Sequence, residues 1–189
     1  MSEVIKAFQI IKKYNQDINI SLLHCTSLYL APNETLNLNA IFTLLKKFKC
    51  AVGYSDHSIG NYASIAAVAL GAKIIEKHFT LNKKFSDPDQ SASANPKELT
   101  NLIKDIRNLE TALGNGKKTP HDAEKNTADV ARRSWHANNK IYANTKINSK
   151  DLILLRPGTG IQSNNIISGL KSNIDIKKGQ KIKINWLYK

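Results

Sequence analysis

The sequence predicts an α/β fold with a parallel sheet, followed by a small domain that is mainly β. Three apolar runs rich in Ile, Leu and Val each end in a polar cluster and alternate with segments of helical periodicity. Strands that are buried on both faces and separated by helices are typical of parallel sheets. After Gly114 the pattern changes to short β-like runs separated by Asn, Gly and Lys. A chain of 189 residues is long enough for both parts.

The predicted elements of the first part alternate between helix and strand along the chain. Apolar residues at helical spacing predict a helix in the opening segment, before the first strand. A later helix at 95–114 has Pro96 near its start and Gly114 at its end, as helix termini prefer. The elements between these two helices are the strands 18–29, 50–58 and 72–80 and the helices 36–49 and 61–71.

The chain divides into two predicted domains. Residues 1–114 form the α/β domain, and the polar, turn-rich segment 115–130 is expected to be a linker. Residues 131–189 carry the short β-like runs and form the small domain, which is close to the lower size limit for independent folding.

Composition and charge exclude several classes of protein. The net charge is +13, but the basic residues are scattered and accompany no helix-turn-helix, RRM or zinc-finger pattern, so we expect no nucleic-acid partner. No secretory signal is evident and the longest apolar stretch is too short to span a bilayer, so we expect a soluble, cytoplasmic protein with no membrane partner. Cys25 and Cys50 lack the spacing of a metal or disulfide motif and are expected to be reduced and buried.

Two histidines follow the ends of neighbouring predicted strands. His57 comes after the second strand and His78 lies near the end of the third, 78 − 57 = 21 residues later, with one helix between them. Parallel α/β folds bind ligands beyond the carboxyl ends of their strands, and this spacing suits adjacent strands. Two neutral imidazoles, together with water or carboxylate oxygens, could hold a divalent metal. The alternative is a pair of unrelated histidines that binds nothing.

Polar groups suited to an oxygen-rich, anionic substrate surround this pair. Strand alternation puts Lys77 on the opposite side from His78, and Glu76 and Lys77 could pair with each other. His24 and Cys25 are expected to serve packing rather than binding. The polar groups are Ser55, Asp56, Ser58, Thr80, Asp89, Ser91 and Ser93, with Thr26, Ser27 and Tyr29 at the end of the first strand.

Five ordered motifs resemble the sialic acid synthase family. They read LLHCTSLYLAP, VGYSDHS, GAKIIEKHFTL, DPDQSAS and LLRPGTGI, and the resemblance runs from about Ile18 to the C-terminus. It implies that residues 1–114 are the C-terminal part of a TIM (β/α)8 barrel and that residues 131–189 are a small SAF, or antifreeze-like, domain of β-clip fold. The family condenses phosphoenolpyruvate with an N-acetylated amino sugar, such as N-acetylmannosamine, to give a nonulosonic acid and phosphate.

The resemblance also implies roles for individual residues. The metal is expected to be Mn²⁺, with Mg²⁺ and Co²⁺ as alternatives, and the partner is a second copy of the chain in a domain-swapped homodimer or a missing N-terminal barrel half. The implied residues are His57 and His78 for the metal, Ser55 for phosphoenolpyruvate, Ser27 and Tyr29 for the phosphoenolpyruvate and sugar pockets, Asp89 for the sugar hydroxyls, and Arg156 for the N-acetyl group of the sugar in the partner copy.

The chain departs from the family pattern in two ways. Leu30, Asp87 and Gln90 replace the usual Pro, Gly and His of two motifs, so the sugar is not specified. A barrel needs eight strands and we count three, while the phosphoenolpyruvate-binding lysines and the catalytic glutamate of the family lie in the missing half. We therefore expect a fragment, a split gene product or a decayed copy, with little or no synthase activity alone.

Two other functions are weighed against a synthase. The small domain could be a non-catalytic module that binds a carbohydrate or a protein partner, with the α/β part as its scaffold. The histidine pair could also belong to a metal-dependent hydrolase that does not use phosphoenolpyruvate.

Overall fold

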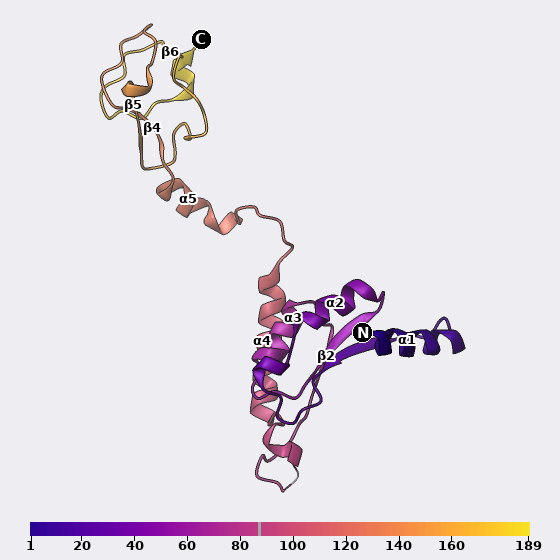
Figure 1. The fold of residues 1–189 in the computed structure, drawn as a ribbon. Helices are drawn as coiled ribbons and strands as arrows, with labels where there is room; N and C mark the ends of the chain where they lie inside the picture. The colour runs from indigo at the N-terminus through magenta and orange to yellow at the C-terminus, as the bar shows by residue number, and fades with distance from the viewer. Residues whose placement is uncertain (87) are drawn as a thin grey trace. The chain divides into compact units, whose positions relative to one another are not determined.

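The computed structural model describes residues 1–86 and 88–189. The chain divides into two compact units, Met1–Gly116 and Lys117–Lys189 (Figure 1). The division falls close to residue 114, where the sequence predicts the end of the first domain. Asp87, one of the departures from the family pattern, lies outside the described residues.

The first unit has the predicted alternation of helices and strands. The strands are shorter than the apolar runs that predicted them, because the polar ends of each run continue as loops. The elements are α1 (Ser2–Tyr14), β1 (Ser21–Cys25), α2 (Asn39–Lys47), β2 (Ala51–Asp56), α3 (Tyr62–Ala69), β3 (Ile74–Lys77) and α4 (Pro96–Leu113), with short 3-10 turns at Asn33–Thr35 and Pro88–Ser91.

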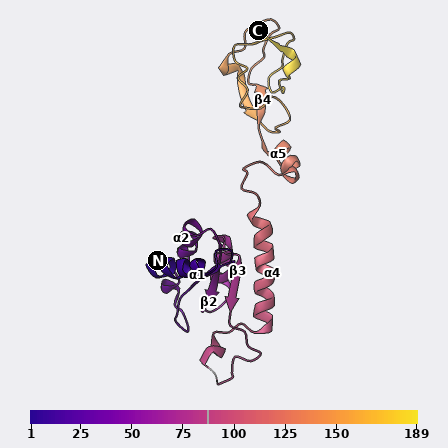
Figure 2. The same ribbon diagram turned by 90° about the vertical axis from the view of Figure 1, so that its right-hand side faces the viewer.

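The sheet is parallel throughout, with strand order β1-β2-β3. Figure 2 shows β2 and β3 side by side. Gly53 allows them to approach, because a Cβ at this position would lie 2.6 Å from the carbonyl oxygen of Ile74. Within the described part of the chain no further strand pairs with β1 or β3 at the edges of this sheet.

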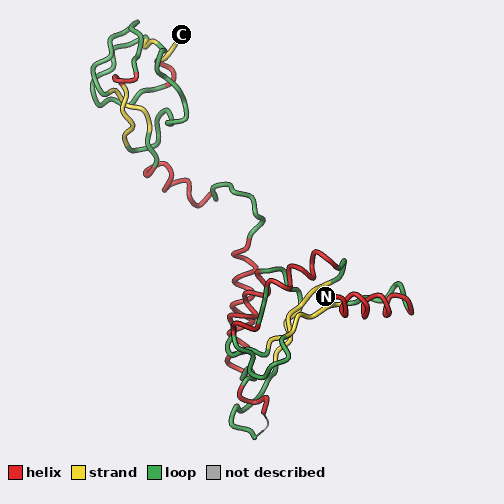
Figure 3. Tube along the Cα trace, viewed as in Figure 1, coloured by secondary structure: helices red, strands yellow, loops and turns green. Residues whose placement is uncertain are grey.

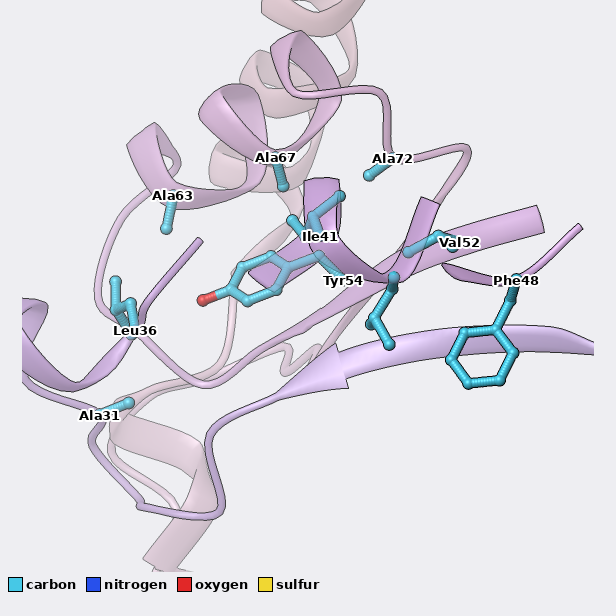
Figure 4. Packing of buried hydrophobic residues seen from close by; sticks show 10 residues of the cluster. Ala31, Leu36, Ile41, Phe48, Val52, Tyr54, Ala63, Ala67 and Ala72 are labelled. Carbon is cyan, nitrogen blue, oxygen red and sulfur yellow. The ribbon is translucent and has the colours of Figure 1, made fainter. Parts of the chain in front are cut away.

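The core of the first unit lies between the sheet and its helices. Val52 and Tyr54 of β2 are fully buried and point toward Ile41 of α2 and toward Ala63 and Ala67 of α3 (Figure 4). The small alanine side chains let α3 pack closely on β2. Because side chains alternate along a strand, the residues between Val52, Tyr54 and Asp56 face the other side of the sheet.

The helix α4 begins and ends as the sequence predicts. Asn95 caps it by accepting a hydrogen bond from the Glu98 backbone N–H, while the Glu98 carboxylate accepts one from the Asn95 backbone N–H. Pro96 occupies the first turn, and Gly114 follows the helix with a positive φ of 58°. Asn61, at the start of α3, donates to the carbonyl oxygen of Glu98 at 3.2 Å and links α3 to α4.

The second unit is built mainly from loops and short strands (Figure 3). Antiparallel pairs join β4 (Ser134–Ala137) to β5 (Leu152–Leu155) and β6 (Lys171–Ser172) to β7 (Leu187–Tyr188). The core of this unit is rich in isoleucine: Ile141, Ile147, Ile161, Ile167, Ile176 and Ile182.

The segment 115–130, predicted to be a linker, contains a 3-10 turn at Asp122–Glu124 and most of the helix α5 (Lys125–Ala131). This helix has no buried residue, so it lacks the apolar periodicity by which a helix is recognised in a sequence. No helix among residues 1–86 and 88–189 has the length and apolar character needed to cross a membrane.

Both cysteines are free, but their expected burial is wrong for Cys25. Cys25 is exposed and Cys50 is partly buried. Cys25 ends β1, which has a neighbouring strand on one side only within the described residues.

Candidate metal centre

The register of β2 and β3 brings the two predicted metal ligands together. Asp56 and Lys77 are the last paired residues of the two strands, so His57 and His78 directly follow the ends of adjacent strands. Their ring centres are 5.4 Å apart, close enough for one ion to reach a nitrogen of each ring. Both rings line a cavity of about 150 Å³ at the carboxyl end of the sheet.

The orientation of His57 leaves one ring nitrogen available to a metal. Its Nδ1 lies 2.9 Å from the carbonyl oxygen of Thr26, at the end of β1. Because a carbonyl oxygen only accepts, Nδ1 is the donor, and in the neutral form of the ring Nε2 then keeps its lone pair. Metal-binding histidines are commonly held this way, by a carbonyl or carboxylate on the nitrogen that does not bind the metal. The thiol of Cys25 lies 3.8 Å from the same Nδ1.

The loop after β1 contributes an aromatic ring to the site. The Tyr29 ring stacks on His57 with centres 4.2 Å apart and meets His78 edge-on at 5.5 Å. Its side chain is half exposed, so one side of the ring faces solvent. Ser27, predicted to act with Tyr29, lies exposed in the same loop.

Ser55 and Glu76 each lie two residues before one of the histidines, on the same face of the strands. The Ser55 hydroxyl donates to Oε1 of Glu76 at 2.7 Å, and both residues line the cavity that holds the two histidines. The local pairing of Glu76 with Lys77 suggested by the sequence is wrong, since alternation sends their side chains to opposite faces. Glu76 was overlooked as a site residue, although it follows Ser55 by the same 21 residues that separate the histidines.

On the opposite face, Asp56 and Lys77 form a buried ion pair. Nζ of Lys77 lies 2.9 Å from Oδ2 of Asp56, with side chains 5% and 0% exposed. Burial alone would raise the pKa of Asp56, but hydrogen bonds from Ser64, Ser58 and Lys77 outweigh it, so the pKa lies below the ordinary value. Asp56 is therefore ionised at neutral pH.

Asp89 lies at the rim of the site. Its Oδ2 is 3.9 Å from Nδ1 of His78, too far for a hydrogen bond, and its side chain is 44% exposed. The segment that follows Asp89 returns to the end of β3. There the backbone N–H of Ala94 donates to the carbonyl oxygen of His78 at 2.8 Å, and the carbonyl oxygen of Ala94 accepts from the backbone N–H of Thr80. The structure thus brings Asp89 beside the histidines but leaves its carboxylate open to solvent.

Arg156 belongs to the second unit. Its Nε donates to the carbonyl oxygen of Ala131 at 3.0 Å, and the residue is exposed. The side chain is thereby tied to the end of α5.

A divalent ion fits the histidine pair as a site with only two protein ligands. Within the described ranges, no group of three or more His, Cys, Asp or Glu side chains is arranged to hold a metal. His57 and His78 would supply two nitrogens, and water or substrate oxygens would complete the coordination, as first-row divalent metals accept. The carbonyl on Nδ1 of His57 is the observation that favours a metal over two unrelated histidines.

A parallel α/β sheet with its polar site at the carboxyl ends of the strands is the arrangement of α/β enzymes. Residues 1–118 match the model of the NeuB family, and the chain belongs to this family.

Two of the similar proteins are named as synthases, one of N,N'-diacetyllegionaminic acid and one of pseudaminic acid. The chain is 41% identical over 184 residues to the N,N'-diacetyllegionaminic acid synthase of Legionella pneumophila, covering 95% of this chain and 52% of the relative. It is 34% identical over 183 residues to the pseudaminic acid synthase of Campylobacter jejuni, covering 96% of this chain and 53% of the relative. The chain spans about half the length of these curated relatives.

Among solved structures, the fold is similar to that of the N-acetylneuraminic acid synthetase of Leptospira borgpetersenii in complex with citrate. The TM-score is 0.60 at 40% identity, and the match covers 67% of this chain and 44% of the other. The α/β character predicted for the first unit is thus confirmed.

Proposed function

We propose that this chain carries the metal-binding end and part of the substrate site of a nonulosonate synthase. The complete enzyme condenses phosphoenolpyruvate with an N-acetylated amino sugar and releases phosphate. The main support is the cluster at the carboxyl end of the sheet, where His57, His78, Tyr29 and the Ser55–Glu76 pair lie together. The relatives, named for three different nonulosonic acids, support the product class.

In this proposal His57 and His78 hold a divalent ion, with Mn²⁺ as the first expectation. When bound, such an ion supplies Lewis acidity that polarises the aldehyde of the open-chain sugar. The Thr26 carbonyl favours the tautomer with the proton on Nδ1, which would leave Nε2 of His57 free to bind the ion. The stacked Tyr29 ring restricts the movement of His57 and limits the access of water to it.

The substrate groups have their own proposed positions. Ser55 contacts phosphoenolpyruvate, and Glu76 orients its hydroxyl through the 2.7 Å hydrogen bond. Tyr29 and Ser27 line the pocket, and the exposed carboxylate of Asp89 accepts hydrogen bonds from sugar hydroxyls. The exposed Arg156 contacts the N-acetyl group of a sugar bound by the partner copy.

We further propose that residues 1–114 form the last three strands of a TIM barrel and that residues 131–189 form a SAF domain. A barrel needs eight strands, and the sheet of the first unit has three among the described residues. The 189-residue polypeptide by itself is therefore expected to have little or no synthase activity. An N-terminal barrel half would supply the remaining strands.

The decisive experiment measures phosphate release from phosphoenolpyruvate, with N-acetylmannosamine and Mn²⁺, by this chain alone and after mixing with an N-terminal half from a relative. Turnover only in the mixture, lost in His57→Ala, supports the proposal. Robust turnover by the chain alone contradicts the expectation of inactivity, and hydrolysis that needs no phosphoenolpyruvate supports a hydrolase.

A binding module remains as a second candidate because the second unit has its own core of isoleucines. Removal of residues 131–189 separates the two functions. If that deletion abolishes sugar binding while His57→Ala and Asp89→Ala both leave it unchanged, the sugar site lies in the second unit and the binding module is favoured over the synthase.

A further inference from the structure

The Asp56–Lys77 pair lies directly behind the two histidines, on the opposite face of the sheet. We propose that this pair is a positioning unit that sets how His57 and His78 face each other. The inference rests on the proposed function, because it assigns a task to two residues that are not metal ligands in it, although Lys77 also lines the cavity that holds the histidines.

Along the two strands, the ion pair comes between the Ser55–Glu76 pair and the two histidines. Asp56 and Lys77 are cross-strand partners, and 77 − 56 = 21, the same offset that separates the histidines. Alternation puts the pairs before and after them on the site face and sends Asp56 and Lys77 toward the helices. The three successive pairs are Ser55 with Glu76, Asp56 with Lys77, and His57 with His78.

The hydrogen bonds of Asp56 hold the backbone on both sides of His57. Its Oδ1 accepts from the backbone N–H of Ser58 at 2.9 Å and from the Ser58 hydroxyl at 2.7 Å. Its Oδ2 accepts from the Ser64 hydroxyl at 2.6 Å and from Lys77 at 2.9 Å. Residues 56 and 58 are thus joined through one carboxylate, and the peptide that carries His57 lies between them.

Lys77 extends the same network to the second histidine. Its Nζ also donates to the carbonyl oxygen of Ser58 at 2.9 Å, and the residue precedes His78 in the chain. The side chain of Lys77 therefore bonds to both residues that flank His57. A rotation of either strand end would break at least one of these bonds.

The pair also selects the register of β2 and β3. A one-residue slip would move Lys77 away from Asp56 and leave a buried charge without its partner, which is strongly destabilising. The slip would also end the alignment of His57 with His78 at the ends of the two strands. Two apolar side chains could fill the same volume with similar stability, but they would not discriminate between registers, and register selection is the best-attested role of buried polar pairs.

The test separates positioning from simple stabilisation by means of three variants of the full chain: Asp56→Asn, Lys77→Met, and the double variant. Each single variant leaves a buried group unpaired and should unfold at a lower temperature. The double variant has no unpaired charge and should recover much of that stability. Positioning predicts that the folded double variant still binds Co²⁺ about tenfold or more weakly than the wild type, as loss of outer-shell partners does in other sites.

A second measurement does not depend on the metal. In the metal-free wild type, NMR cross-relaxation between ring protons of His57 and His78 should be visible, because the ring centres are 5.4 Å apart. The folded double variant should lose these cross-peaks. The matched control is Lys83→Met with Glu98→Gln, which removes another Lys–carboxylate pair of the first unit, 2.7 Å apart, and should leave both measurements unchanged.

The outcomes distinguish this inference from the proposed function. If the folded double variant binds Co²⁺ as tightly as the wild type and keeps the cross-peaks, the pair is only structural and the inference is overturned. A different result is that the wild type binds no Co²⁺ but shows the cross-peaks, and the double variant lacks them. In that case the pair positions the histidines, and the metal site of the proposed function is wrong.

Discussion

His57 donates its Nδ1 proton to the carbonyl oxygen of Thr26 across 2.9 Å, and this bond connects the ends of β1 and β2. A ring held by its Nδ1–H offers Nε2 as a ligand. The bond therefore predicts that Nε2 of His57 is the atom that binds a metal.

The first prediction concerns the histidine pair. His57→Ala and His78→Ala should each weaken Mn²⁺ binding by at least about 10- to 100-fold, because loss of a ligand costs more than loss of its outer-shell partner. The measurement is a titration followed by the paramagnetic effect of Mn²⁺ on water relaxation. His121→Ala is the control, since His121 is an exposed residue of the second unit. Equal binding by all three variants and the wild type would exclude the pair as the metal site.

The second prediction concerns the packing of α3 on the sheet. Ala67→Leu should lower the free energy of unfolding by about 1–3 kcal/mol, because Ala67 is fully buried in the core that contains Tyr54 and there is no room for three more carbon atoms. Urea denaturation measures the change. Ala69→Leu, at the exposed end of the same helix, is the matched control and should have little effect. Similar losses for both variants would show that α3 does not pack as described.

The alternation of apolar runs with helical segments was sufficient to predict the parallel sheet and the position of its site. Strands and helices have different periods of side-chain direction, and β2 and β3 show both the apolar run and the intervening helix clearly. The same alternation predicted that His57 and His78 lie at one end of adjacent strands. It could not show their separation, which depends on register.

The side-chain pairs between β2 and β3 could not be predicted from the sequence. Glu76 and Lys77 are neighbours of opposite charge, which suggests a local pair, but they face opposite sides of the sheet and bind Ser55 and Asp56 instead. Such partners become visible only when the register is known, because many offsets between two strands are compatible with the same apolar pattern. The helix α5 was missed for a different reason, since it buries no residue.

The third prediction links strand spacing to the site. Gly53→Ala should destabilise the first unit by about 1–3 kcal/mol, because the new Cβ would lie 2.6 Å from the carbonyl oxygen of Ile74 and would push β3 away from β2. It should also weaken Co²⁺ binding, since His57 and His78 extend from these two strands. Gly116→Ala is the control: its φ of 74° makes the substitution strained, but a Cβ there meets nothing within 4 Å and lies outside the sheet, so Co²⁺ binding should be unchanged. Unchanged Co²⁺ affinity in a folded Gly53→Ala protein would show that the strand spacing does not control the site.

The fourth prediction concerns the stability of the first unit in acid. The hydrogen bond from Lys83 to Glu98, followed by that from the Asn95 backbone, lowers the pKa of Glu98 below its ordinary value. A folded-state pKa below the unfolded value means that the stabilising contribution is fully present above the unfolded pKa, about 4.3 for Glu. It is lost as the pH falls through the lower, folded pKa.

Glu98→Gln isolates this contribution, because Gln can still accept the bond from Asn95 at the start of α4. The difference in unfolding free energy between wild type and variant should be constant from pH 7 to about pH 5 and should shrink steadily below the ordinary Glu pKa. Urea denaturation at a series of pH values measures it. Asn101→Ala, at an exposed and non-titratable position of α4, is the control and should show no comparable trend. A difference between wild type and Glu98→Gln that stays constant to pH 3 would mean that Lys83 and the helix cap do not stabilise the charged form of Glu98.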